Sequence, residues 1–299
     1  MTTQMEGRKL ETTVYNHGPQ AYEAQLVPRI FRPWAERLVG AANLMAGERV
    51  LDLACGTGIV ARTAAPRVGP RGTVVGVDVN PAMLDLARSL TGDSIEFVES
   101  NAQDLPFEDS SFDVAFCQQG LQFFTDRLAA LREVYRVITP RGRAVFAIWR
   151  GLEHHLAMDT MDRVVARYLP AEALEGSDAP FWLGDLEQVR TLFASAGFAR
   201  VYIRTHISEI RFRSAGEMLN GLTGAHAPVA GAIAALDDEI KETMYREMAD
   251  AFATYTDDDG VLFPRPGRWS SHASSLGVYS SQLNRGNRMT SVELIEQGR

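Results

Sequence analysis

The chain has 299 residues, of which 45% are hydrophobic and 23% are charged, and this composition is typical of a globular protein. Its 30 Lys and Arg against 38 Asp and Glu give a net charge of −8, which disfavours a protein that wraps nucleic-acid phosphates. No apolar run is long enough for a transmembrane helix, and the first thirteen residues lack the apolar segment of a secretory signal. The two cysteines, Cys55 and Cys117, indicate neither a disulfide framework nor a zinc site. We therefore expect a cytoplasmic protein that binds no metal, no nucleic acid and no membrane.

The first segment, residues 1–48, is expected to form a helical cap. Apolar residues recur there at four-residue spacing and form one stripe: Tyr22, Leu26, Ile30, Trp34 and Leu38. Because Pro28 and Pro33 interrupt this stretch, we expect two short helices rather than one long helix.

The next segment alternates short apolar runs with helical patterns. The apolar runs predict buried strands over 49–54, 73–78, 95–99, 112–117 and 143–149. Helices are expected between them, over 59–67, over 81–90 with Asn80 as N-cap, and from Thr125 to about 138. This alternation predicts an α/β fold whose parallel sheet carries helices on both faces.

The second half of the chain has a different pattern. Residues 150–184 carry no strand signal, and we expect them to form loop and short helix over the carboxyl edge of the sheet. Further along we expect a helix over 185–196 ending at Gly197, a strand over 199–212, helices over 214–222 and 235–255, and a strand over 260–263. After Arg265 the sequence has little periodicity.

The turn after the first predicted strand carries the strongest functional signal. It reads Leu51-Asp-Leu-Ala-Cys-Gly-Thr-Gly58, and its glycines allow the backbone to approach a ligand closely. The next helix begins just beyond it, so its N-terminal amides face the same place. Asp78 ends the second strand 20 residues after Gly58, where a carboxylate can bind both hydroxyls of a ribose. The sequence thus predicts a nucleoside site at this edge of the sheet.

Two nucleoside cofactors are compatible with this turn. Gly56 to Ala61 match the G-x-G-x-x-A dinucleotide pattern, so an NAD(P)-dependent oxidoreductase is one candidate. However, Asp52 lies four residues before Gly56, and a carboxylate there would repel a pyrophosphate but suit an ammonium group. Asn101 to Gln103 add polar atoms that can contact an adenine edge. Ribose, adenine and a cationic amine without phosphate favour S-adenosylmethionine.

Residues 49–150 resemble the class I S-adenosylmethionine-dependent methyltransferases, and are most similar to the ubiquinone/menaquinone-biosynthesis branch and to bacterial small-molecule methyltransferases. Four blocks carry the resemblance, which covers about a third of the chain: Val50–Ile59, Val74–Leu84, Asn101–Arg127 and Leu131–Arg150. The resemblance implies a Rossmann-like, seven-stranded, mostly parallel sheet with helices on both faces, and S-adenosylhomocysteine as the product of the cofactor.

The resemblance also implies a role for each residue of the cofactor site. Asp52 would hold the methionine amino group, and Asp78 would bind the ribose hydroxyls. Val79 and Met83 would pack on one face of the adenine, and Ala102 and Gln103 would cover the other. The remaining cofactor-binding candidates lie in the turns after three strands: Ala54, Cys55, Gly56, Thr57, Gly58, Asn101 and Gln118.

The chain departs from the family pattern in two places. Asn101 stands where the family usually has Asp, which removes the charge from that adenine contact. A seventh, antiparallel strand is implied near 261–270, but the apolar run breaks there at Arg265-Pro-Gly-Arg268. We therefore expect a methyltransferase domain over 49–264, with cover insertions at 150–184 and 213–258, and an irregular segment over 265–299.

The methyl acceptor has to be inferred from the cover. Its many apolar residues favour a hydrophobic or aromatic small molecule, methylated on oxygen, nitrogen or carbon. His154 and His155 are the candidates for a general base, each with the alternative of a merely solvated residue. The substrate-binding candidates are Tyr15, Tyr22, Gln119, Trp149 and Trp182. A homo-oligomer is possible, and a cyclase or a binding protein of the same fold stays open as an alternative.

Overall fold

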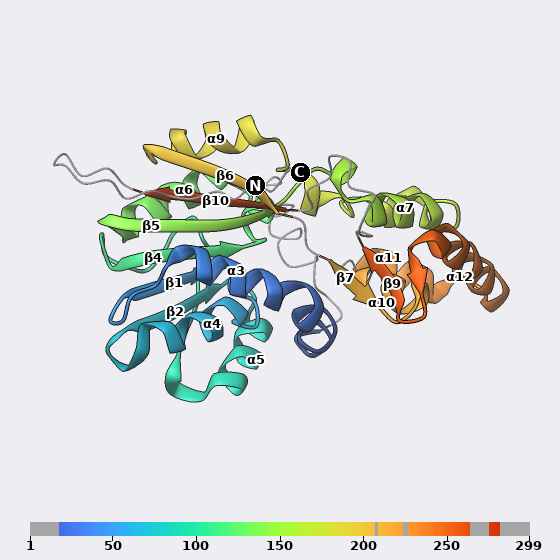
Figure 1. Ribbon diagram of the computed structural model, residues 1–299, viewed down its shortest axis with the longest axis horizontal. Coiled ribbons are helices and arrows are strands. Elements are labelled where there is room, and N and C mark those ends of the chain that lie inside the picture. The colour runs from blue at the N-terminus through green and yellow to red at the C-terminus, as the bar shows by residue number, and fades with distance from the viewer. Residues whose placement is uncertain (1–17, 207–208, 224–226, 264–274, 282–299) are drawn as a thin grey trace.

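The computed structural model describes residues 18–206, 209–223, 227–263 and 275–281, and its largest element is a seven-stranded sheet (Figure 1). The strand order is β3-β2-β1-β4-β5-β10-β6. Its strands are β1 Arg49–Leu53, β2 Thr73–Asp78, β3 Glu96–Glu99, β4 Phe112–Gln118, β5 Ile138–Trp149, β6 Arg200–His206 and β10 Ser275–Ser281. The α/β fold predicted from the alternating pattern is confirmed, as is the Rossmann-like sheet that the resemblance implies.

Five adjacent strands, β3 to β5 in this order, run parallel to one another, so their carboxyl ends share one edge. The chain moves from β1 outward to β3 and then returns to place β4 on the other side of β1. Ligands of open α/β sheets bind where the strand order reverses in this way. The sheet topology therefore directs attention to the ends of β1 and β4.

Helices cover both faces of the sheet (Figure 1). One face is covered by α3 Arg32–Ala42, α4 Ile59–Val68 and α5 Pro81–Thr91, whose apolar sides share a core with Val50 and Phe116. The other face is covered by α6 Arg127–Val137 and α9 Leu186–Ser195, which enclose Leu51 and Phe146. These two cores hold the carboxyl edge rigid.

The N-terminal segment is one continuous helical stretch rather than the two short helices we expected. It consists of α2 Pro19–Ala21, the π-helix η1 Tyr22–Phe31 and α3. Pro28 lies inside η1, where the wider turns let the Arg32 N–H reach the Val27 carbonyl. Pro33 lies in the first turn of α3, directly after the π-helix, and like Pro28 it supplies no N–H donor.

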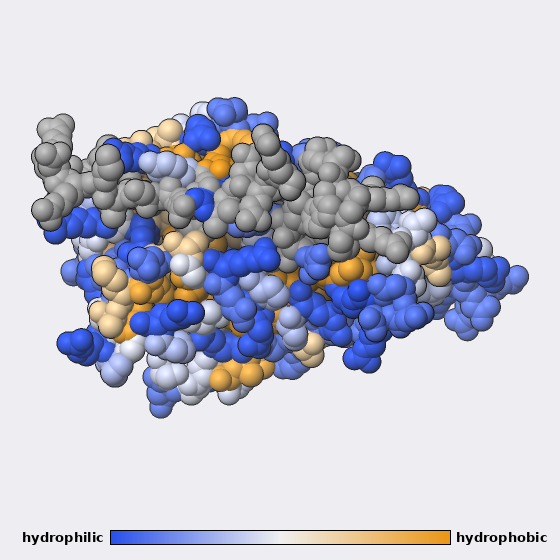
Figure 2. All heavy atoms as spheres, viewed as in Figure 1, coloured by the Kyte–Doolittle hydropathy of each residue, from blue (hydrophilic) through white to orange (hydrophobic). Residues whose placement is uncertain are grey.

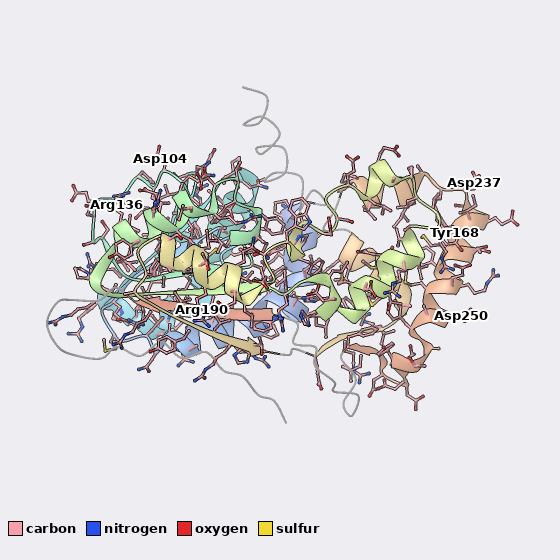
Figure 3. All side chains as sticks on the ribbon, turned by 90° about the horizontal axis from the view of Figure 1, so that it is seen from above. Asp104, Arg136, Tyr168, Arg190, Asp237 and Asp250 are labelled. Carbon is pink, nitrogen blue, oxygen red and sulfur yellow. The ribbon has the colours of Figure 1, made fainter. Side chains whose placement is uncertain are left out.

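The cover forms a second lobe beside the carboxyl edge (Figures 1 and 3). It contains α7 Leu156–Val165, α8 Ala171–Leu174, α10 Ala215–Thr223, α11 Ala227–Ala235 and α12 Asp238–Phe252, with a small sheet of β7 Ile210–Phe212, β9 Gly260–Phe263 and β8 Thr256–Asp257. Figure 3 places Tyr168, Asp237 and Asp250 on this lobe, and Asp104, Arg136 and Arg190 on the sheet lobe. Hydrophilic residues cover the outer end of this lobe (Figure 2).

The cover has its own apolar core, which includes the fully buried Met218, Met244, Met248 and Phe252. Single-turn helices connect the larger elements: η2 Gly69–Arg71, η3 Gly92–Ser94, η4 Leu121–Phe123, η5 Leu152–His154, η6 Ala179–Phe181 and η7 Ala253–Tyr255. Among the described helices, none has both the length and the apolarity needed to cross a membrane.

Three further element assignments were wrong. The pattern at 199–212 is two strands, β6 and β7, that belong to different sheets. The N-cap of α6 is Asp126, whose Oδ1 accepts from the Ala129 N–H at 2.9 Å, and not Thr125. The antiparallel strand implied near 261–270 lies instead at 275–281, as β10 between β5 and β6, so the segment after Arg265 contributes to the main sheet.

Candidate functional site

A pocket opens at the carboxyl edge of the sheet, between the ends of β1, β2 and β4 and the N-terminal helix. Its lining includes eight of the residues predicted from the sequence: Tyr22, Ala54, Gly56, Asp78, Val79, Met83, Gln118 and Gln119. Five others complete it: Phe31, Asn80, Gly120, Phe123 and Phe124. Segments up to about a hundred residues apart in the sequence therefore meet at one site.

The turn after β1 is built from left-handed backbone. Ala54, Gly56 and Gly58 have φ values of 53°, 55° and 80°. At Gly58 an added Cβ would also lie 2.9 Å from the Phe97 ring, so both the conformation and the packing require glycine. This turn leads directly into α4 and brings its backbone to the wall of the pocket.

The turn after β4 is packed tightly against the turn after β1. Gln119 is held at φ 48° while its N–H donates to the Ala147 carbonyl at 2.8 Å. At the next residue, Gly120, an added Cβ would lie 2.6 Å from the Ala54 Cβ. Each turn thus fixes the position of the other, and a non-glycine residue in a left-handed conformation is a form of strain found at functional sites.

Asp78 lies at the end of β2, where the sequence placed the ribose carboxylate. Its Oδ2 accepts from the Gly56 N–H at 2.7 Å and its Oδ1 accepts from the Asn80 N–H at 2.9 Å. These bonds connect the carboxylate to the glycine turn and to the N-cap of α5. Because Asp78 also lines the pocket, its carboxylate is positioned to bind neighbouring hydroxyl groups of a ligand.

Asp52 lies behind the glycine turn and does not line the pocket. Its side chain is 1% exposed, and its Oδ2 accepts from the Ala61 N–H at 2.9 Å in the first turn of α4. Burial raises the pKa of this carboxyl group to about 8, and the nearby charge of Asp78 acts in the same direction. An ammonium group bound in front of the turn would favour the ionised form, so the residue still fits an amine-bearing cofactor.

The N-terminal helix closes one side of the pocket. The rings of Tyr22 and Phe31 line it with their centroids 5.0 Å apart. Glu23 fastens this helix to the glycine turn, because its carboxylate accepts from the Thr57 hydroxyl at 2.5 Å and from Arg62 at 2.7 and 2.9 Å. At its other end, Gln118 Nε2 donates to the Phe31 carbonyl at 3.0 Å.

The loop after β3 lies beside Asp78 but does not line the pocket. The Ser100 N–H donates to the Asp78 carbonyl at 3.1 Å. Ala102 is buried, whereas Asn101 is exposed and its Oδ1 accepts from the Gln103 N–H at 2.9 Å. The adenine contacts expected of Asn101, Ala102 and Gln103 therefore stay predictions.

The two histidine candidates lie away from the pocket lining. His155 packs between Trp149 and Phe181, with ring centroids 5.6 and 4.6 Å away, and burial lowers its pKa to about 3. His154 Nε2 lies 3.3 Å from Glu153 Oε1. An imidazole that stays neutral far below pH 7 is a poor proton acceptor, so the geometry favours a packing role for His155.

The other predicted residues have varied surroundings. Trp149 packs against Trp34 with centroids 6.1 Å apart, and Trp182 is 49% exposed; neither lines the pocket. Cys55 is buried, and burial raises the pKa of its thiol. Tyr15 lies outside the described residues. In the described part of the chain, no group of three or more His, Cys, Asp or Glu is arranged to hold a metal ion.

Sequence reasoning missed five pocket residues: Phe31, Asn80, Gly120, Phe123 and Phe124. Gly120, Phe123 and Phe124 follow Gln118 and Gln119 closely, within a sequence block already singled out. Their closeness in sequence to these two candidates was the signal that could have identified them. Phe31 gave no such signal, because its position at the site depends on how the helix η1–α3 packs.

Comparisons with known proteins agree with this geometry. Residues 51–146 match the family model described as a methyltransferase domain. The ubiquinone/menaquinone biosynthesis C-methyltransferase UbiE of Hahella chejuensis is 43% identical over 119 residues, which are 38% of this chain and 48% of that protein. UbiE of Xanthomonas campestris pv. campestris is 44% identical over 120 residues, 38% of this chain and 47% of that protein. The chain thus spans about half the length of these relatives.

Solved structures share the fold. The YcgJ protein of Bacillus subtilis superimposes with a TM-score of 0.52 at 19% identity, over 84% of this chain and all of that one. Phosphoethanolamine N-methyltransferase 2 of Haemonchus contortus, solved with S-adenosyl-L-methionine, gives 0.57 at 18% identity, over 93% of this chain and 60% of that one.

The sheet topology and the glycine turn agree with the match of residues 51–146 to a methyltransferase domain, and they resemble the class I methyltransferase fold. Within that class, the chain is similar to the ubiquinone/menaquinone-biosynthesis branch.

Proposed function

We propose that this protein transfers a methyl group from S-adenosylmethionine to an apolar or aromatic small molecule, on oxygen, nitrogen or carbon, in quinone-type or secondary-metabolite biosynthesis. The observation that carries the proposal is the position of Asp78, which lines the pocket and is hydrogen-bonded to Gly56 of the glycine turn in a domain of methyltransferase type.

The residues of the pocket fit this cofactor. Asp78 would bind the ribose hydroxyls, and Val79 and Met83 would contact the adenine. Asp52 lies behind the glycine turn, where its carboxylate would favour the methionine ammonium. When bound, S-adenosylmethionine supplies a methyl group that is already activated on a sulfonium. The protein's own task is therefore alignment and exclusion of water, to which Tyr22 and Phe31 contribute as the closed side of the pocket.

The apolar lining of the pocket favours an apolar or aromatic methyl acceptor. Phe31, Phe123 and Phe124 present aromatic rings, and the cover lobe packs beside the same edge. We expect the partner to be a small molecule bound between the carboxyl edge and the cover. His154 and His155 are not carried into this mechanism, because neither lines the pocket.

Thermal unfolding with added nucleotides provides the first test. S-adenosylhomocysteine at about 100 times its Kd should stabilise the protein by about 2.7 kcal/mol, whereas NADH should leave the Tm unchanged. Stabilisation by NADH alone would indicate an NAD(P)-dependent oxidoreductase instead. Transfer of labelled methyl to an apolar acceptor then separates a methyltransferase from a cyclase or a binding protein of the same fold.

A further inference from the structure

Three glutamines, one at the end of β4 and two just after it, bury polar atoms that have no hydrogen-bond partner among the described residues. Gln118, Gln119 and Gln122 are 9%, 3% and 1% exposed. The unpaired atoms are Gln118 Oε1 and both amide atoms of Gln119 and of Gln122. Leaving a buried amide unpaired costs about 1–3 kcal/mol for each lost group. Gln118 and Gln119 also line the pocket, so their unpaired atoms point to a ligand that is bound during function.

The orientation of the Gln118 amide is fixed by the protein. Its nitrogen donates to the Phe31 carbonyl, and a carbonyl can accept only from the nitrogen end of an amide. Oε1 is therefore the free end, on a residue that lines the pocket. This oxygen can be satisfied only by a hydrogen-bond donor, such as a hydroxyl group of a ligand.

Gln119 offers the complementary atoms. Its left-handed backbone is fixed by the bond to the Ala147 carbonyl and by the close packing of Gly120 on Ala54. Its amide has two donor hydrogens and one acceptor oxygen, all unpaired within the described structure, and the residue lines the pocket beside Gln118. The pair can therefore accept one hydrogen bond and donate another to the same molecule.

The charge of the pocket restricts the ligand further. Of the described residues that line it, Asp78 is the one whose side chain ordinarily carries a charge at neutral pH, and none is Lys, Arg or His. A phosphate or carboxylate group on an acceptor would lie near this carboxylate without a cation to pair with. Phenylalanine rings and neutral amides instead favour an uncharged aromatic molecule.

We infer that Gln118 and Gln119 position the methyl acceptor, by accepting a hydrogen bond from one group and donating a hydrogen bond to an oxygen on an uncharged ring. The Asp78 carboxylate in the same lining disfavours phosphorylated or carboxylated acceptors. The inference rests on the proposed function, since it assigns the amides to the acceptor and not to the cofactor. Both are positioning residues and take no part in proton transfer.

Gln122 offers a matched control in the same turn. Its amide is as deeply buried and as unpaired, but it does not line the pocket. Replacing it with leucine removes the cost of an unpaired buried amide without removing a contact to a ligand in the pocket. Gln122→Leu should therefore raise the Tm and leave ligand selection unchanged.

The experiment titrates three ligands of one shape against the full chain, with and without S-adenosylhomocysteine: 2,3-dihydroxynaphthalene, naphthalene and 2-naphthyl phosphate. We expect the dihydroxy compound to bind about tenfold more tightly than naphthalene, the equivalent of two modest hydrogen bonds, and the phosphate not to compete. Gln119→Leu and Gln118→Leu should each reduce this preference to about threefold or less. Asn suits a left-handed backbone, so Gln119→Asn should fold and should lose part of the preference for the dihydroxy compound.

The outcomes separate the two proposals. Three outcomes would overturn the inference. The first is that Gln119→Leu keeps the full preference for the dihydroxy compound. The second is that the unaltered protein binds naphthyl phosphate more tightly than the dihydroxy compound, and the third is that the glutamine variants lose affinity for S-adenosylhomocysteine but keep the ligand preference. Failure of the unaltered protein to bind S-adenosylhomocysteine would instead overturn the proposed function. The titrations without this compound still test the amides in that case.

Discussion

The carboxyl group of Asp52 is almost entirely removed from water, and its pKa of about 8 makes cofactor binding sensitive to pH. Only the ionised form attracts an ammonium group, and below pH 8 that form must first be produced by loss of a proton. We expect the affinity for S-adenosylhomocysteine to rise between pH 6 and pH 8, by at most about tenfold per pH unit, and then to level off. Isothermal titration across this range measures it.

Asp52→Asn is the control variant for this dependence. The amide oxygen can still accept from the Ala61 N–H, so the fold of the turn is kept while the titrating group is removed. The variant should show weaker binding with little change across pH 6–8. The affinity for 5′-methylthioadenosine, which lacks the amine, should be flat in both proteins. A flat profile for S-adenosylhomocysteine in the unaltered protein would contradict this account.

His155 is expected to matter for stability rather than for turnover. Its ring fills the space between Trp149 and Phe181 and is hydrogen-bonded to the backbone of Arg150. His155→Ala should lower the free energy of unfolding by about 2–4 kcal/mol, because it leaves a cavity among aromatic rings. Below the melting temperature, labelled-methyl transfer should stay within about threefold of the unaltered protein, as should that of His154→Ala. A loss of activity of 100-fold or more in either variant, with the fold intact, would restore a histidine base to the mechanism.

At the residue scale, sequence reasoning succeeded where chain neighbours determine the position. Gly56 and Asp78 follow buried strands, and the parallel sheet brings their ends together, so their proximity was predictable. The surroundings of His155 could not be predicted in this way, because they are formed by Trp149 and Phe181, and only the tertiary structure shows that these rings pack against the imidazole.

Glu23 of the π-helix η1 is hydrogen-bonded to Thr57 of the glycine turn and to Arg62, and we predict that this contact limits access to the pocket. Glu23→Ala removes the bonds to Thr57 and Arg62, so we expect the helix to move away from the turn more often. The dissociation rate of S-adenosylhomocysteine should rise about five- to tenfold, with a smaller change in the association rate. Stopped-flow displacement measures both rates.

Glu36→Ala provides the comparison, since Glu36 is exposed on α3 of the same helical segment. It should leave both rates unchanged. Thr57→Val, which removes one of the two partners of Glu23, should have an intermediate effect on dissociation. If Glu23→Ala dissociates at the rate of the unaltered protein, the helix does not limit access to the pocket.

At the element scale, periodicity predicted the five parallel strands and the helices between them, because each has a continuous apolar face. It failed at Pro28, where a π-helix tolerates the missing N–H donor. It also failed at 199–212, because β6 and β7 have similar patterns but pair in different sheets. Local propensity does not specify which partner a strand will choose.

The molecule contains two lobes with separate apolar cores, and the residues that line the pocket belong to the sheet lobe. Phe252 is fully buried in the cover core against Phe263, with ring centroids 5.0 Å apart. Phe252→Leu should therefore destabilise the cover by about 1–2 kcal/mol and weaken acceptor binding, while the affinity for S-adenosylhomocysteine stays within about twofold. Calorimetry with titration of each ligand tests this.

Phe193→Leu is the matched substitution in the core of the sheet lobe, where Phe193 is also fully buried. It should reduce the stability of the lobe that holds the cofactor pocket. Equal losses of S-adenosylhomocysteine affinity in both variants would show that the two cores act as one cooperative unit.

The position of β10 has a consequence for synthesis of the chain. Strand β6 reaches the sheet only through β10, which follows it by about seventy residues and lies between it and β5. While the ribosome is still making the cover, both β5 and β6 have an open edge, and such edges can pair with other chains. Residues 275–281 must therefore emerge before the sheet can close. Until then, protection of these edges depends on the cover or on a chaperone.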